Sequence, residues 1–183
     1  MVDPPAARPD AAARKVFWAV VVLAAVVHAP GLFGGYTLDD HHAIVRHPAV
    51  QGELPLWEVW TREWFGRPLL EGWSSSYRPV TSTSFALEMR IVDGPFLSHF
   101  VNWSLFVGLC GVLTKALLER VSTRAALGAG LLFALWPVHV EAVASLVGRA
   151  ELLASLFALL ALLRVERDEP RLSDVAAAGF LYA

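Results

Sequence analysis

The chain has 183 residues, of which 56% are hydrophobic and 17% charged, and its formal net charge is −2. Soluble domains are nearer half apolar and a quarter charged, so this composition argues against a soluble domain. The near-neutral charge gives no indication of nucleic-acid binding. The single cysteine, Cys110, excludes a disulfide within the chain.

Long charge-poor runs carry the excess of apolar residues, which is typical of bilayer spans. The first run could also be the core of a cleaved signal peptide, but it is long enough to cross and more runs follow it. The third and fourth runs are short for a hydrocarbon core of about 30 Å, and we interpret them as a hairpin with a polar turn. We expect spans at 16–33, 96–118, 125–138 and 150–163, and a truncated fifth span at 174–183.

The basic residues predict the orientation of these spans. Nine of the fifteen Lys and Arg residues fall in the N-terminal tail and in the two connectors on the same side. The positive-inside rule makes that side cytoplasmic. We therefore expect residues 1–15 to be a cytoplasmic tail, disordered because it is rich in Pro and Ala. The long loop 34–95 is then extracytoplasmic.

This loop holds four of the seven tryptophans. The stretch Leu54–Phe65 predicts a short helix with Trp57, Trp60 and Trp64 on one face, a pattern that favours a position in the membrane interface. Packing of the tryptophans into a small core of the loop is the alternative. A second helix is predicted from Pro79 to Val92, because Pro suits a first helical turn.

Polar residues gather at both ends of this loop. Asp39 and Asp40 follow the first span, where a carboxylate can act as a general base toward a hydroxyl. A solvated loop start is the alternative. A metal site with the nearby histidines is another, although their spacing matches no strong zinc pattern. Arg78, after Tyr77, is suited to bind a phosphate through its planar fork, or to anchor the chain at the interface.

Further polar residues lie at the outer ends of the later spans. His99 and Asn102 are one helical turn apart, so they share a face. Polar groups in short spans are costly unless they pair or serve a function, and mutual pairing of Glu141 with Arg149 is one explanation. All these clusters map to one side of the membrane, which favours a single shared site. The polar turn of the hairpin contributes His139, Glu141, Arg149 and Glu151.

An ordered set of short motifs resembles the transmembrane and tetratricopeptide-repeat O-mannosyltransferases, a family of the GT-C class of glycosyltransferases. Each motif is weak alone, but their order and spacing over residues 16–165 are specific. The sequence departs from the family at Trp136, where histidine is more common, which puts a role for that position in doubt. The matching stretches are Leu38–His41, Ala43–Val45, Ser76–Thr81, His99–Asn102, Phe133–Ala134, Pro137–His139, Glu141–Ala144 and Gly148–Leu153.

The resemblance implies an all-helical integral membrane fold, in which this chain is the N-terminal part of a GT-C bundle. It also implies transfer of a sugar, typically mannose, from a polyprenyl-phosphate carrier to a Ser or Thr hydroxyl of an acceptor protein. No cofactor is implied. Asp39 or Asp40 would be the catalytic carboxylate, with Asp39 favoured because it aligns with the leading acidic residue of the motif. A non-enzymatic transporter or scaffold is the competing interpretation.

The same resemblance places further spans and helical repeats beyond this sequence. We therefore expect residues 1–183 to be inactive alone. The residues expected to bind the lipid phosphate or the substrates are Tyr77, Arg78, His99, Asn102, His139, Glu141, Arg149 and Glu151.

Overall fold

The computed structural model describes residues 11–71 and 76–166. Over these residues the chain is helical, and the only β pairing is an isolated bridge between Arg62 and Pro68. The long helices are α1 (Ala11–His28), α3 (Phe96–Arg120), α4 (Thr123–Leu135) and α6 (Arg149–Val165). The short helices are η1 (Ala29–Phe33), η2 (His41–Val45), η3 (Leu56–Thr61), α2 (Pro79–Met89), α5 (His139–Ala144) and η4 (Leu146–Gly148).

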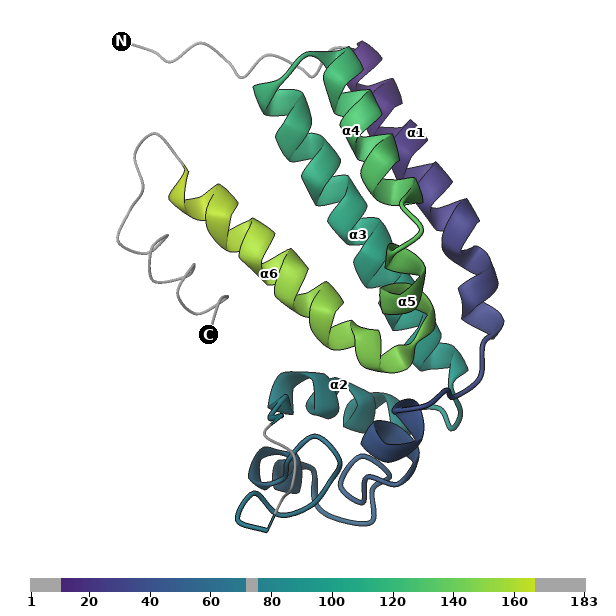
Figure 1. The fold of residues 1–183 in the computed structure, drawn as a ribbon, viewed down its shortest axis with the longest axis vertical. Coiled ribbons are helices and arrows are strands. Elements are labelled where there is room, and N and C mark those ends of the chain that lie inside the picture. Colours follow the sequence, from purple (N-terminus) through teal and green to yellow (C-terminus); the bar gives the residue numbers. More distant parts are fainter. Residues whose placement is uncertain (1–10, 72–75, 167–183) are drawn as a thin grey trace.

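The long helices form a bundle, and the outer loop, residues 34–95, forms a compact region at one end of it (Figure 1). Three segments of the described chain are long and apolar enough to cross a membrane: Ala11–Phe33, Phe96–Arg120 and Leu146–Val165. Helix α4 has 13 residues and so rises only about 20 Å. The helix is interrupted at Trp136 and Pro137. Helix α5 then continues toward the outer loop, and α6 runs back in the opposite direction (Figure 1).

Local sequence explains where several helices begin and end. Pro30 lies at the start of η1, so the α-helical hydrogen bonds of α1 give way there to a tighter turn. Pro79 occupies the first turn of α2, where its missing N–H costs nothing. The hydroxyl of Ser122 accepts a hydrogen bond from the Ala125 N–H at 3.4 Å and so caps α4.

Helices α1, α3 and α4 pack side by side around a buried apolar core. Gly130 of α4 allows this close approach. A Cβ there would lie 3.0 Å from the Thr114 hydroxyl of α3 and 3.1 Å from Val20 of α1. Helix α1 is therefore an integral part of the bundle. The core residues are Val20, Ala24, Phe106, Cys110, Ala134, Val143 and Leu152.

The outer loop has its own core, to which η4 of the bundle contributes Leu146. Trp64 is part of this core, whereas Trp57 and Trp60 of η3 are exposed. Trp64 therefore agrees with the alternative in which the tryptophans pack into the core of the loop, whereas Trp57 and Trp60 do not. The other members are Ala43, Ile44, Ala49, Val50, Val59, Phe85 and Ala86.

The structure corrects three predicted boundaries. The helix predicted for 54–65 is a 3₁₀ helix limited to Leu56–Thr61, and α2 ends at Met89 rather than Val92. Helix α1 begins at Ala11, inside the tail predicted to be disordered. The first ten residues and the fifth span predicted at 174–183 lie outside the described residues.

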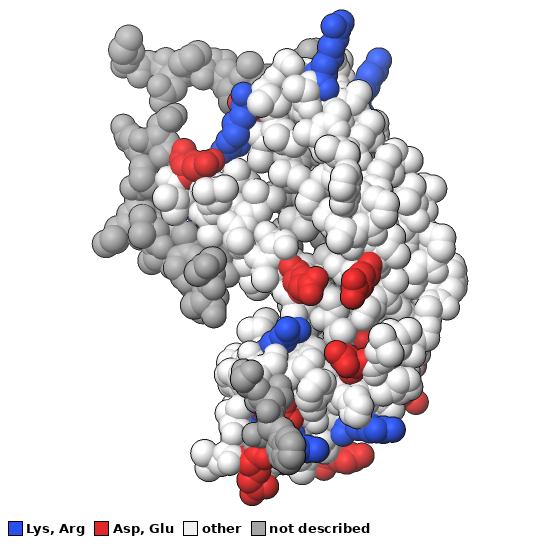
Figure 2. All heavy atoms as spheres, viewed as in Figure 1, with Lys and Arg blue, Asp and Glu red and all other residues white. Residues whose placement is uncertain are grey.

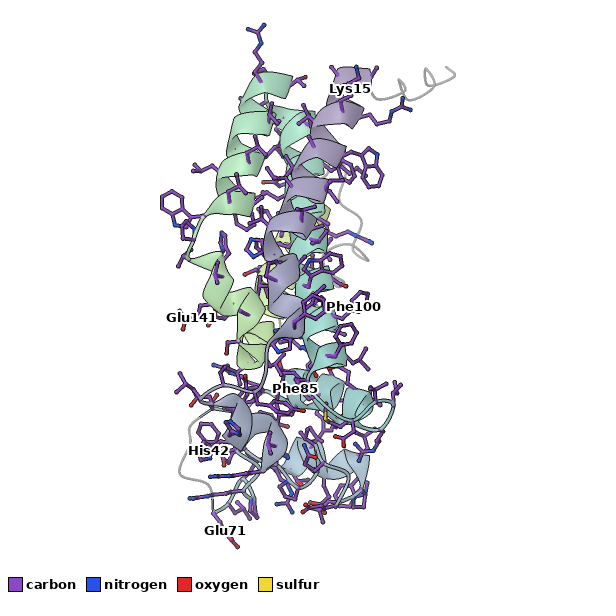
Figure 3. All side chains as sticks on the ribbon, turned by 90° about the vertical axis from the view of Figure 1, so that its right-hand side faces the viewer. Lys15, His42, Glu71, Phe85, Phe100 and Glu141 are labelled. Carbon is purple, nitrogen blue, oxygen red and sulfur yellow. The ribbon has the colours of Figure 1, made fainter. Side chains whose placement is uncertain are left out.

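Lys15 lies at the end of the bundle remote from the outer loop, which carries Glu71 at its far tip (Figure 3). Lys15 belongs to the basic segments from which the orientation is predicted, and it lies at the opposite end of the bundle from the outer loop. The orientation itself stays a prediction.

Candidate functional site

A cleft of about 350 Å³ opens where the bundle meets the outer loop. Its walls come from the loop after η1, the stretch that precedes α2, and the turn from α5 to α6. The charged residues that line it are Asp39, Arg78, Glu141 and Glu151. Acidic and basic side chains gather around this waist of the molecule in Figure 2. Four residues singled out by sequence are therefore brought together from three separate stretches.

All four charged side chains are exposed to solvent in the cleft. The guanidinium carbon of Arg78 lies 5.0 Å from the centre of the Trp64 ring, so the arginine rests on a buried aromatic platform. A cation over an indole face is attracted by the ring electrons. This contact orients Arg78 and leaves its nitrogen atoms available to an anion.

Glycine at position 148 sets the shape of one wall. A Cβ on Gly148 would lie 2.5 Å from the carbonyl oxygen of Ala142, closer than any side chain tolerates. Only glycine lets η4 pack this tightly against α5. The tight turn brings Glu141 of α5 and Glu151 of α6 to the same cleft.

Asp40 does not line the cleft, although it is adjacent to Asp39 in sequence. Its side chain is fully buried. One carboxylate oxygen, Oδ2, accepts hydrogen bonds from the N–H and the hydroxyl of Thr37 at 2.9 and 3.0 Å. The other, Oδ1, accepts from the Val147 N–H at 2.9 Å. The two carboxylates of the acidic pair thus have different surroundings.

Arg149 is also absent from the cleft lining, and it is fully buried. It lies over the Phe85 ring at 4.1 Å and forms an ion pair with Glu88 of α2. The pairing with Glu141, which was the structural alternative for this residue, is not observed. In this arrangement Arg149 joins α6 to α2 and α3 and does not face a ligand. Its other acceptors, each at 2.8 Å, are Asn102 Oδ1, the Ser84 hydroxyl and the Ser98 carbonyl.

The remaining predicted residues also lie away from the cleft. Asn102 is buried and donates to the carbonyls of Ser145 and Leu146. His99 is buried beside Gly34, and His139 packs between aromatic rings of the bundle. The exposed Tyr77 donates its hydroxyl to the Trp60 carbonyl at 2.8 Å.

Sequence reasoning missed the partners of Arg149. Ser84 and Glu88 are four residues apart on the predicted second helix, so they share a face. Glu88, the only charged residue of α2, was the available signal. Ser98, which donates to Glu88 at 2.6 Å, completes the group.

Two further observations concern ligands. Among the described residues, no group of three or more His, Cys, Asp and Glu side chains is placed to hold a metal ion. A second cavity, of about 590 Å³, lies between α3 and α6 at the other end of the bundle, beside Lys115 and Arg120. Its charged residues include the ion pair of Arg120 with Glu166, and none of the predicted site residues lies there.

Curated proteins resemble this chain over most of its length. Protein O-mannosyl-transferase TMTC4 of Homo sapiens is 36% identical over 167 residues, which cover 80% of this chain and 22% of that protein. Protein O-mannosyl-transferase F38B6.6 of Caenorhabditis elegans is 33% identical over 79% of this chain and 22% of its own length. Protein O-mannosyl-transferase TMTC1 of Mus musculus is 39% identical over 75% of this chain and 15% of its own length.

This chain belongs to the family of these transmembrane and tetratricopeptide-repeat proteins. The membership agrees with the ordered motifs and with the helical fold. The chain spans only 15 to 22% of the length of these three relatives. No protein-family model and no solved structure matches it.

Proposed function

We propose that the protein transfers a mannosyl group from a polyprenyl-phosphate carrier to a Ser or Thr hydroxyl of an acceptor protein, on the extracytoplasmic side. The relatives are named protein O-mannosyl-transferases, which supports the sugar and the protein acceptor. The single observation that carries the mechanism is the cleft in which Asp39 and Arg78 are both exposed. The cleft lies where the outer loop meets the apolar helices of the bundle, which supports the proposal of a lipid-linked donor.

Asp39 is the proposed general base. A Ser or Thr hydroxyl is a poor nucleophile at neutral pH, so its proton must be removed as it attacks the sugar. The new bond forms between the acceptor oxygen and the anomeric carbon, while the bond from that carbon to the phosphate oxygen breaks. The proton passes to the Asp39 carboxylate, and the bonding electrons leave with the carrier phosphate.

Arg78 is the proposed partner of that phosphate. Negative charge grows on the leaving phosphate, and a planar guanidinium stabilises it through two parallel hydrogen bonds. Glu141 and Glu151 would repel the phosphate, so we place them toward the sugar, whose hydroxyls donate to carboxylates. This division puts the anion at one end of the cleft and the neutral sugar at the other.

The test is transfer of labelled mannose from polyprenyl-phosphate mannose to an acceptor protein by the full-length polypeptide. Asp39→Asn keeps the shape of the side chain but loses the base, so we expect the rate to fall by at least about a hundredfold. Arg78→Lys keeps the charge without the fork, so we expect weaker use of the donor with little change in the apparent affinity for the acceptor.

Glu53→Gln is the matched control, because Glu53 is an exposed carboxylate of the outer loop that does not line the cleft. Its activity should equal that of the wild type. A protein that is folded and membrane-inserted but incorporates no label would instead favour a transporter or scaffold. Near wild-type transfer by Asp39→Asn would remove Asp39 from the catalytic role.

A further inference from the structure

One wall of the cleft is held in place by side chains from other elements. The wall includes Ser145, Val147 and Gly148, in the short segment between α5 and α6. Asn102 of α3 donates to the carbonyls of Ser145 and Leu146 at 3.1 and 3.2 Å. These bonds help to fix where the segment lies, together with the packing of Leu146 in the core of the outer loop and of Gly148 against Ala142.

Asp40 supplies the corresponding bond from the opposite wall. Its Oδ1 accepts the Val147 N–H, while its Oδ2 accepts both donors of Thr37. The carboxylate therefore connects the loop that carries Asp39 to the segment that leads into Glu151. No other hydrogen bond from a side chain of this loop to η4 is present among the described residues.

We propose that Asp40 is a positioning residue, which holds the η4 wall at the distance from Asp39 that the transfer reaction requires. The inference rests on the proposed function and divides the acidic pair into a base and a tether. A base must reach the hydroxyl whose proton it takes. Asp40 is fully buried and does not line the cleft, whereas Asp39 is exposed in it.

Asp40→Asn tests the tether, because the substitution keeps the shape of the side chain but replaces one carboxylate oxygen with an NH2 group and removes the negative charge. One oxygen of Asn can still accept one bond. The NH2 group of Asn, however, must face either the donors of Thr37 or the N–H of Val147. A buried donor that faces another donor loses its hydrogen bond and destabilises that contact. The wall should then detach from the loop without loss of Asp39.

Hydrogen exchange of the full-length protein measures this detachment directly, independently of activity. In Asp40→Asn we expect the peptides that contain Thr37 and Val147 to exchange at least about tenfold faster, since local opening exposes their N–H groups. Peptides from α3 and α4 should be unchanged. Asp39→Asn is the matched control, and its exchange should equal that of the wild type.

Kinetics separate positioning from catalysis. A misplaced wall should lower kcat by about a hundredfold, as misplacements of about 1 Å do in other enzymes. The KM for the polyprenyl-phosphate donor should change little, because Arg78 is intact. In Asp40→Asn the rate should still fall at acid pH, because the proposed base is intact. In Asp39→Asn the residual rate should no longer show this fall.

Unchanged exchange at both Thr37 and Val147 in Asp40→Asn would overturn the proposal. A second result would also overturn it. If Asp40→Asn kept some activity but no longer lost rate at acid pH, and Asp39→Asn were nearly as active as the wild type, Asp40 would be the base. If Asp40→Asn does not accumulate, Thr37→Ala removes only the hydroxyl bond and should show the same pattern more weakly. Wild-type protein without transfer activity would overturn the proposed function, and the exchange comparison would then decide on the tether alone.

Discussion

At the scale of single residues, the buried pair of Arg149 and Glu88 joins α6 to α2. Both side chains are out of water, and each satisfies the charge of the other. Removal of one member leaves an uncompensated charge, whereas an exposed pair contributes little because water screens it. The contribution of an ion pair to stability therefore depends on its burial.

Glu88→Ala should accordingly lower the free energy of unfolding by about 3–5 kcal/mol, measured by denaturant unfolding in detergent micelles. Glu166→Ala is the matched control, because it breaks the exposed pair of Glu166 with Arg120. We expect that change to cost less than about 1 kcal/mol. Equal effects of the two substitutions would contradict the structural role of the buried pair.

His47 predicts a dependence of stability on pH. Burial, with a smaller contribution from the nearby Arg62, lowers the pKa of His47 from 6.5 to about 4, although its own backbone and Glu63 oppose the shift. The neutral form is thus favoured in the folded state, so the unfolded state binds more protons between about pH 6.5 and 4. Stability should be complete above pH 6.5 and fall by about 3 kcal/mol as the pH approaches 4.

The measurement is unfolding of the wild type and of His47→Asn across this pH range. Carboxylates titrate in both proteins, so the difference between their slopes isolates His47. His42→Asn serves as the control, because His42 is exposed. A slope that is the same in His47→Asn and the wild type would contradict the buried neutral histidine.

At the scale of elements, the tryptophans of the outer loop have two surroundings. Trp57 and Trp60 lie three residues apart in a 3₁₀ helix, which has three residues per turn, so they share an exposed face. Trp64 follows the end of η3 and enters the core beneath Arg78. The predicted α-helical spacing had placed all three on one face.

Trp64→Ala should therefore cost about 3–5 kcal/mol of stability and weaken donor use, since it removes the platform of Arg78. Trp57→Ala should change the stability by about 0.5 kcal/mol or less, as exposed substitutions do. Unfolding monitored by circular dichroism makes this comparison. A larger loss for Trp57 than for Trp64 would contradict the burial of Trp64.

The sequence was most informative where one physical constraint acts over many residues. Bilayer thickness requires long apolar runs, and three of the predicted spans coincide with described helices that are long and apolar enough to cross a membrane. Contacts between distant residues leave no such pattern. The sequence offers Glu141 as a nearby partner for Arg149, whereas the partner in the structure is Glu88 of α2. Asp39 and Asp40 are adjacent and chemically alike, so only the folded backbone separates the exposed carboxylate from the buried one.

At the scale of the whole molecule, the outer loop and the basic end of the bundle lie on opposite sides of the spans (Figure 3). The positive-inside rule predicts that the outer loop lies outside the cytoplasm. Cysteines introduced at Glu53 and Ser122, both exposed, should differ in a Cys110→Ala background. In intact cells, an impermeant maleimide should label the cysteine at 53 and not the one at 122. The reverse pattern would invert the topology and move the cleft to the cytoplasmic side.

The Arg149–Glu88 ion pair also sets an order for biosynthesis. Glu88 precedes Arg149 by 61 residues. At about 5–20 residues per second, the ribosome therefore makes the acid roughly 3–12 seconds before its partner. During that interval α2 has no cation from α6 to neutralise Glu88, and Asp40 has no Val147 amide to bind. The outer loop can reach its final packing only after α6 has emerged, so a segment made early in synthesis matures after the helices that follow it.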